Sequence, residues 1–372
     1  LQINLGNGGR KIGIVIDSSG SNLDTDPNDL RVVAGRTLNS ALVTAAGATG
    51  GKQPDLVTVV DFDYSATVIY GLGDPAGAGP SFSSIDSSGG TYIAEGVKAA
   101  YDELTKQNSG STADRTGIIV LTDGEDSSAD ELVTEIQRAG NASIKVSFGF
   151  LSPSGSSPSY PEVLSAILNT GGIFRTVDTD SAQQAFISTV LANGLTTSDG
   201  GTDVSSILIS GLSIAASSNS NGPNTFTYTG TAGEKINITI TALEKQTLDG
   251  SIRDASGTEL TTGSINAAGV AALTLDLVND GPLSVLVSAA SGSGLFTIGL
   301  NSSLGVSNCT LVPPVTNGTS GGGGGNNATV TPSAHLPTAT GKPPQFTGAA
   351  AAVNVAGAST FGLLAFFAAA LL

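Results

Sequence analysis

The sequence predicts an α/β domain with a doubly wound, mostly parallel sheet, followed by an antiparallel β-sandwich and a disordered stalk. Three observations lead to this expectation. Short apolar runs alternate with helical patterns over the first half of the chain. The pattern then changes to a strict alternation of apolar and polar residues. Beyond residue 303 the chain is rich in Pro, Thr, Gly and Asn, a composition that cannot bury a core.

The first half of the chain has the order of strands and helices that a doubly wound domain requires. The expected strands are residues 11–16, 56–60, 66–70, 117–121, 144–151 and 173–177. The expected helices are residues 28–48, 92–106, 128–139, 161–168 and 181–192. Ser128 and Glu131 have the spacing of a capping box, which predicts where the third helix starts. We expect this domain to occupy residues 1–195.

The second half of the chain shows the two-residue period of strands that bury one face. Ile236, Ile238 and Ile240 alternate with polar residues, and residues 273–277 and 296–300 repeat this pattern. Turn sequences separate the strands at residues 254–257, 279–282 and 291–294. We therefore expect an antiparallel β-sandwich over residues 203–303. A Ser/Thr/Gly/Pro-rich stalk follows over residues 304–347.

Polar side chains stand where two of the buried strands end and where one helix begins. Asp17, Ser19 and Ser21 follow the first strand, Asp123 follows the strand at 117–121, and Thr91 precedes a helix. The carboxyl ends of parallel strands meet at one edge of a sheet, so these side chains should lie together. Two carboxylates and three hydroxyls favour Mg²⁺, Mn²⁺ or Ca²⁺ over zinc or copper. Because Mg²⁺ takes about six ligands, a position stays open for water or for a partner's carboxylate.

These five residues resemble the metal-ion-dependent adhesion site of von Willebrand factor type A domains. The pattern of that site is DxSxS, then a threonine after small residues, then an aspartate in a TDG-like turn. Asp17, Ser19, Ser21, Thr91 and Asp123 match it position by position. The resemblance implies divalent-metal-dependent adhesion or ligand binding at a cell surface. The partner would be an extracellular protein or an acidic glycan that supplies a carboxylate.

Other interpretations of the same residues stay open at this point. Asp17 and Asp123 could cap turns in a degenerate site, which would make the chain a structural cell-wall protein with the domain as a scaffold. The run FTYTGTAGEKINITITAL, followed by LDGSIRDASGTEL, is similar to prepeptidase carboxyl-terminal β-domains, so the chain could instead be a non-catalytic part of a secreted processing system. Glu125 and Asp126 are close enough to hydrogen-bond around the metal site, but they are interpreted as solvated acids ahead of a helix. Asp61 and Asp63 are interpreted as solvated acids at a hairpin tip.

The composition argues against catalysis and against nucleic acid as a partner. The sole histidine, His335, lies in the predicted stalk, so neither domain can hold a His-based triad, a HExxH zinc site or a His general base. A GxxxxGK[ST] phosphate loop is missing. The net charge of −16 disfavours nucleic acid and anionic membrane surfaces as partners. We expect a binding protein rather than an enzyme.

The last 25 residues have the order of a glycosylphosphatidylinositol attachment signal, which is removed when the lipid is added. The run FTGAA at 346–350, small in all but its first residue, is followed by a weakly polar spacer and by the apolar residues 361–372. Gly348 is the expected attachment residue, and Asn354 is the alternative. The apolar part is shorter than the roughly 20 residues that span a bilayer. Together with the Ser/Thr/Gly-rich stalk, this Ala-rich tail resembles those of fungal surface proteins.

Several further features fit an exported glycoprotein. Asparagine stands in six N-glycosylation sequons, at Asn141, Asn237, Asn301, Asn308, Asn317 and Asn327. The sequence has no methionine, which suggests that an amino-terminal signal peptide was removed. Cys309 is the only cysteine, so an internal disulfide is excluded and both domains depend on their cores. We expect the protein at the cell surface, anchored to the plasma membrane or the cell wall.

Overall fold

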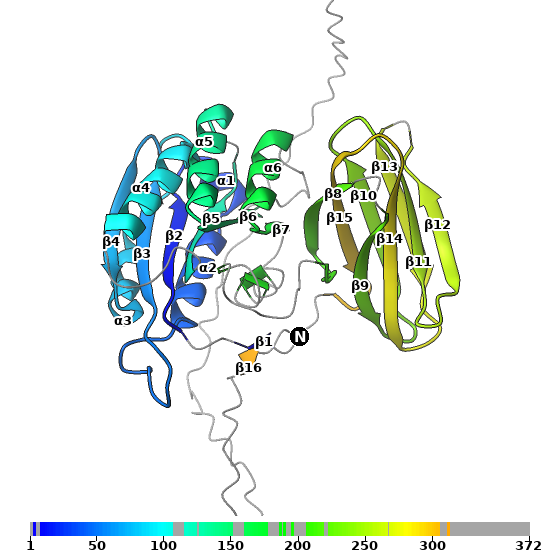
Figure 1. Cartoon of the computed structure of the whole chain (residues 1–372), viewed down its shortest axis with the longest axis horizontal. Coiled ribbons are helices and arrows are strands. Elements are labelled where there is room, and N and C mark those ends of the chain that lie inside the picture. The colour runs from blue at the N-terminus through cyan, green and yellow to red at the C-terminus, as the bar shows by residue number, and fades with distance from the viewer. Residues whose placement is uncertain are drawn as a thin grey trace, which may run out of the picture. The chain divides into compact units, whose positions relative to one another are not determined.

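The computed structural model describes residues 3–4, 8–106, 115–124, 126–151, 160–177, 186–187, 189–190, 195–196, 206–218, 222–266, 268–305 and 311–312 (Figure 1). All of them belong to one compact unit, Leu1–Thr316. Most of the predicted stalk, the whole predicted attachment signal and most of the helix predicted at 181–192 lie outside these residues. Those three expectations therefore stay predictions.

A mostly parallel sheet forms the centre of the first domain. Its strands are β2 (Lys11–Asp17), β3 (Leu56–Phe62), β4 (Ala66–Gly73), β5 (Thr116–Thr122), β6 (Lys145–Leu151) and β7 (Phe174–Val177). They lie in the order β7-β6-β5-β2-β3-β4, and only β4 is antiparallel to its neighbour within this group. The expected doubly wound, mostly parallel α/β fold is confirmed.

Helices pack against both faces of this sheet. They are α1 (Asn22–Thr25), α2 (Leu30–Ser40), α3 (Pro75–Ala78), α4 (Ile93–Lys106), α5 (Ala129–Asn141) and α6 (Pro161–Asn169), with the 3₁₀ helix η1 (Gly79–Ser83). Successive side chains of β2 enter opposite cores because a strand alternates its faces. Ile14 and Ile16 join the core that holds Leu38 of α2, whereas Val15 joins the core that holds Val97 of α4. Both faces of the central strand are therefore buried, which explains its continuous apolar sequence.

Two local expectations about helix starts need correction. The helix predicted at 28–48 is shorter, since α2 begins at Leu30 and ends at Ser40. Asp26 fixes its start, because the carboxylate accepts from the backbone N–H of Leu30 and of Arg31. The predicted capping box is wrong: the Ser128 side chain makes no capping bond, and its backbone N–H instead donates to Asp126 Oδ1 at 2.5 Å.

The second region consists of antiparallel strands, as expected. They are β8 (Leu212–Ser218), β9 (Asn224–Gly230), β10 (Lys235–Ala242), β11 (Thr247–Arg253), β12 (Glu259–Ser264), β13 (Val270–Asp276), β14 (Gly281–Ser291) and β15 (Gly294–Ser302). One layer has the order β13-β10-β15-β8 and the other β12-β11-β14-β9. The alternating residues Ile236, Ile238 and Ile240 are fully buried in their shared core. Strand β8 also pairs antiparallel with β7, and a short β1 (Ile3–Asn4) pairs with β16 (Leu311–Val312).

Candidate metal centre

Asp17 forms the buried base of the predicted site. It is the last residue of β2, and its side chain is fully buried. The Ser19 backbone N–H donates to its Oδ1 at 2.7 Å, and the Thr122 hydroxyl, from the end of β5, donates to its Oδ2 at 2.6 Å. Both carboxylate oxygens are therefore oriented by residues from the ends of two adjacent parallel strands.

A chain of hydroxyl contacts leads from this base toward the solvent. The hydroxyls of Ser19 and Ser21 lie 3.0 Å apart, and Ser21 Oγ donates to Asp123 Oδ1 at 3.0 Å. Asn22 Nδ2 donates to Ser19 Oγ at 3.1 Å. Ser19 is buried, Asp123 is half-buried and Ser21 is exposed. The site is therefore buried at Asp17 and open to solvent at Ser21.

Thr91 completes the cluster from a third loop. The Gly20 N–H donates to the Gly89 carbonyl at 3.2 Å, which holds that loop against the DxSxS turn. Gly89 has a φ of +89°, a conformation that favours glycine. A methyl group on Gly124 would be in van der Waals contact with the Thr91 side chain, so Thr91 lies beside the Asp123 turn. The structure thus brings all five predicted ligand residues together from three loops.

Arg31 is a residue of this centre that the sequence analysis missed. Its side chain is fully buried, and its Nε donates to the Asp17 carbonyl at 2.5 Å. Its Nη2 donates to the Asp86 carbonyl and to Ser87 Oγ, each at 2.8 Å, and its Nη1 pairs with Asp26 at 2.8 Å. Arg31 therefore ties the end of β2 to the segment that leads to Thr91. Its position in an amphipathic helix carries no motif that would have revealed this role.

Burial sets the electrostatics of the site. It raises the pKa of Asp17 from an ordinary 3.8 to about 6, although the bonds from Ser19 and Thr122 lower it, and the nearby Asp123 adds to the rise. A carboxylate that is costly to keep charged in isolation is stabilised by a bound cation. The donor set also fits, since it offers two carboxylates and three hydroxyls and no nitrogen or sulfur. Among the described residues no group of three or more His, Cys, Asp or Glu could hold a metal ion.

Three acids near the site were expected to be solvated. The structure instead buries two of them at least partly and gives the third a hydrogen bond to the backbone. Asp126 is buried, and its Oδ2 accepts from the Ala94 N–H of α4 at 2.7 Å, so it links the starts of α4 and α5. Asp61 is half-buried, which raises its pKa. Asp63 accepts from the Ser65 N–H at 3.0 Å within the hairpin turn. Glu125 lies outside the described residues.

Two large apolar side chains are exposed next to the site. Leu23, in α1 and two residues after Ser21, is 66% exposed. Tyr64, at the β3–β4 turn, is 71% exposed, and a Cβ on Gly90 would lie 2.6 Å from its ring. Tyr64 therefore lies against the residue that precedes Thr91. Sequence patterns gave no reason to connect either residue with the site.

The remaining sequence-predicted residues lie elsewhere or outside the described part of the chain. The sequon residue Asn141 is exposed at the end of α5. Asn237 and Asn301 face each other in the register of β10 and β15. The residues outside the described part are Asn308, Cys309, Asn317, Asn327, Gly348 and Asn354. In the part of the chain that the structure describes, no helix is long and apolar enough to cross a membrane.

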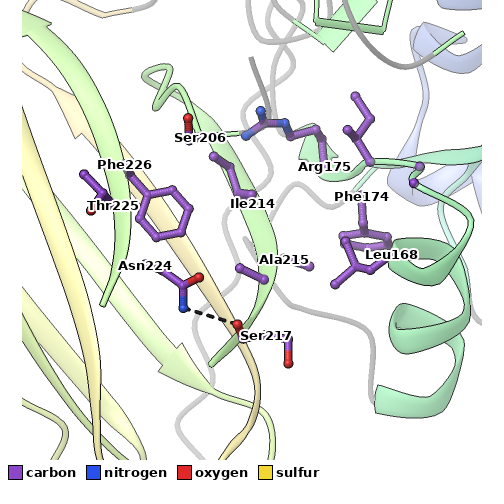
Figure 2. Close-up of a pocket in the computed structure, with 14 residues that line it drawn as sticks. Leu168, Phe174, Arg175, Ser206, Ile214, Ala215, Ser217, Asn224, Thr225 and Phe226 are labelled. Atoms are coloured by element: carbon purple, nitrogen blue, oxygen red, sulfur yellow. Dashed lines mark hydrogen bonds between the residues drawn. The ribbon is translucent and has the colours of Figure 1, made fainter. Parts of the chain in front are cut away.

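A separate cavity of about 520 Å³ lies along β7 and β8 and contains none of the predicted site residues (Figure 2). Phe174 and Leu168 lie on one side of it and Ile214 and Phe226 on the other. Asn224 Nδ2 donates to the Ser217 carbonyl at 3.2 Å. Arg175 is fully buried at its edge, which lowers the pKa of its guanidinium to about 9.

Comparison with known proteins identifies the first domain. Residues 11–189 match the von Willebrand factor type A domain family, so the chain contains a domain of that family. No curated protein matches the chain.

Solved structures resemble parts of the chain. An aerotolerance-related membrane protein from Bacteroides fragilis, with multiple mutations to serines, is 24% identical over 48% of this chain and 96% of its own, with a TM-score of 0.37. Proximal thread matrix protein 1 from the mussel byssus, with a zinc-occupied metal-ion-dependent adhesion site, is 18% identical over 51% of this chain and 46% of its own, with a TM-score of 0.40. The pre-peptidase C-terminal domain of a Bacillus anthracis collagenase is 14% identical over 26% of this chain and 90% of its own, with a TM-score of 0.22.

Proposed function

We propose that this chain binds a divalent cation, Mg²⁺ or else Mn²⁺ or Ca²⁺, through Asp17, Ser19, Ser21, Thr91 and Asp123. The observation that carries the proposal is the continuous contact from Ser19 to Ser21 to Asp123, which joins residues 102 positions apart in the sequence. An uninterrupted set of oxygen donors at the carboxyl edge of a parallel sheet is suited to a hard cation.

The cation would be the point at which a ligand attaches. The two carboxylates balance the formal charge of a divalent ion and the other three residues offer only neutral hydroxyls, so the ion can still accept a further oxygen ligand on its open side. Ser21 is exposed, and Asp123 and Thr91 are half-buried, which leaves that side accessible to solvent. A carboxylate of an extracellular protein or an acidic glycan would complete the coordination. Adhesion or ligand binding that depends on the metal is the resulting function.

The surroundings of the site favour a protein ligand over a glycan. The exposed Leu23 and Tyr64 offer apolar contact area next to the open side of the site. The aliphatic side chain of Leu23 gains most from contact with apolar side chains of a partner, and aromatic residues such as Tyr64 are enriched at protein–protein interfaces. Variants of Leu23 and Tyr64 should therefore weaken capture of a protein ligand without changing cation affinity.

The place of action that we propose is the cell surface. The sequons at Asn141, Asn237 and Asn301 stand at exposed or half-buried positions of the described chain, which is compatible with glycans there. The attachment signal at 348–372, with Gly348 or Asn354 as the lipid-bearing residue, would tether the protein. Release of the protein from cells by a phosphatidylinositol-specific phospholipase tests this part of the proposal.

The first test of the function is calorimetric titration of Mg²⁺, Mn²⁺ and Ca²⁺ into the full chain. We expect one site that Asp123→Ala abolishes while the variant stays folded by circular dichroism. Asp130→Ala is the matched control, because Asp130 is an exposed aspartate in the first turn of α5. Absence of cation binding in the unchanged chain would leave the domain as a scaffold.

A further inference from the structure

We infer that Thr25 is a positioning residue of the metal centre and that it holds Asp123 in place for the cation. The inference rests on the proposed function, because it concerns the same cation. Thr25 is not part of the five-residue pattern, and its hydroxyl is not one of the proposed ligands.

The geometry places Thr25 one helical turn after Ser21. The Thr25 backbone N–H donates to the Ser21 carbonyl at 3.1 Å, so both residues project from the same side of α1. The Thr25 hydroxyl donates to Asp123 Oδ2, and Ser21 Oγ donates to Asp123 Oδ1 at 3.0 Å. Each oxygen of the Asp123 carboxylate therefore accepts from a hydroxyl of this short segment, one from Ser21, the N-cap residue of α1, and one from Thr25, its last residue.

The role of these two hydroxyls changes when a cation binds. Ser21 must then turn oxygen lone pairs toward the ion, which restricts the direction in which it can donate its proton. Thr25 does not coordinate the cation in this proposal, so its hydroxyl can keep donating to Asp123 Oδ2 when the site is occupied. Asp123 follows the end of β5, beyond the last ladder pair of that strand with β6, so side-chain bonds fix its carboxylate. Loss of a hydrogen bond that orients a metal ligand typically weakens metal binding by about 10- to 100-fold.

A purely structural role for Thr25 makes a different prediction. The Thr25 hydroxyl also lies 2.9 Å from the Ser21 carbonyl and has a single hydrogen, so in a purely structural role it would donate to that carbonyl, as many helical threonines do, and not to Asp123. If that bond were its only purpose, removing the hydroxyl would change the stability of the domain and leave its cation affinity unchanged. Thr37 provides the comparison, because its hydroxyl donates to the Val33 carbonyl at 2.8 Å in α2, away from Asp123.

The experiment compares Mg²⁺ and Mn²⁺ affinities of the full chain with those of Thr25→Val, Thr25→Ser and Thr37→Val. Calorimetry gives the dissociation constants, and melting curves in EDTA show whether each variant is folded. We expect Thr25→Val to raise the dissociation constant about tenfold or more. Thr25→Ser keeps the hydroxyl and should stay within about twofold of the unchanged chain, as should Thr37→Val.

The outcomes separate this inference from the proposed function. Thr25→Val with unchanged or tighter cation binding would overturn the role of Thr25 and leave the metal site standing. Failure of the unchanged chain to bind either ion would overturn the proposed function, and the inference with it. Should Thr25→Val not fold, Thr25→Ala, which avoids a branched side chain in the same space, provides the same comparison. A Thr25→Ser chain as weak as Thr25→Val would also count against the hydroxyl.

Discussion

The Nε of Arg31 lies 2.5 Å from the backbone carbonyl oxygen of Asp17, so a buried guanidinium holds the main chain of the residue at the base of the candidate metal centre. The same guanidinium donates to the Asp86 carbonyl. Two of the three loops that form the site are thus connected through one side chain. The Asp26 carboxylate balances the charge of Arg31, because its Oδ2 lies 2.8 Å from Arg31 Nη1.

Replacing Arg31 by lysine should loosen this connection. An ammonium group cannot reach the Asp17 and Asp86 carbonyls and Asp26 together, because it lacks the planar fork of arginine. We expect Arg31→Lys to lower the free energy of unfolding by about 1–3 kcal/mol and to weaken Mg²⁺ binding several-fold. Urea unfolding and calorimetry measure the two effects.

Arg36→Lys is the control for that substitution. Arg36 lies in the same helix but is exposed, and it makes one bond to Ser83 Oγ. Its replacement should change neither quantity measurably. Equal effects of the two substitutions would contradict a special role for Arg31.

Cation affinity should fall in mildly acidic solution because of Asp17. Its pKa is raised to about 6, and a protonated carboxyl is a poor cation ligand. Below pH 6 each unit of acidification should weaken Mg²⁺ binding by about tenfold, since one proton must leave first. Titrations at pH 7.5, 6 and 5 test this dependence. A dissociation constant that is constant over this range would show that Asp17 is not the titrating ligand.

The same shift makes a prediction for stability in EDTA. Between the ordinary pKa of 3.8 and about 6, the folded chain binds more protons at Asp17 than the unfolded chain does. The contribution of Asp17 to the free energy of unfolding must therefore decrease as the pH rises through this window. Asp17→Asn should remove that part of the pH dependence, which melting curves at pH 4.5 and 7 can measure.

Asp126 should contribute to stability and not to cation binding. Its two oxygens accept from the backbone N–H groups of Ala94 and Ser128, which begin α4 and precede α5. Asp126→Ala leaves both donors without this acceptor, and we expect a loss of about 2 kcal/mol in the free energy of unfolding. Cation affinity should be retained, measured under conditions where the variant is folded. A loss of affinity in the folded variant would instead assign Asp126 to the metal centre.

The strands, and the grouping of the five side chains at one edge of the sheet, could be predicted from the sequence for a physical reason. Parallel strands buried on both faces are continuous apolar runs, as in β2 and β5, and residues just after such runs must emerge at one edge of the sheet. This reasoning needs no knowledge of side-chain contacts. The prediction that Asp17 and Asp123 would lie close together therefore succeeded.

The supporting residues could not be predicted in the same way. Arg31 belongs to an amphipathic helix, where arginine usually faces solvent, and only the tertiary arrangement buries it. Thr25 lies in α1, a helix of four residues, which is too short to produce a periodic pattern. By sequence alone Asp126 resembles a solvated acid. Its hydrogen bond to the Ala94 N–H joins residues 32 positions apart and is visible only in the folded chain, whereas its bond to the Ser128 N–H is local.

Close packing of α4 on the sheet depends on the absence of a side chain at Gly96. A Cβ there would lie 2.7 Å from Val15 Cγ1 and 3.0 Å from the Phe62 ring, both of which are buried. Gly96→Ala has two opposing effects, since alanine favours the helix by about 1 kcal/mol but forces α4 away from β2 and β3. We expect overpacking to dominate, with a net loss of about 1–2 kcal/mol in the free energy of unfolding.

Gly79→Ala, at a position where a Cβ would meet nothing within 4 Å, should be close to neutral. Because α4 begins two residues after Thr91, the displaced helix should also weaken Mg²⁺ binding in the Gly96 variant alone, and intact affinity there would mean that the loop holds Thr91 independently of α4.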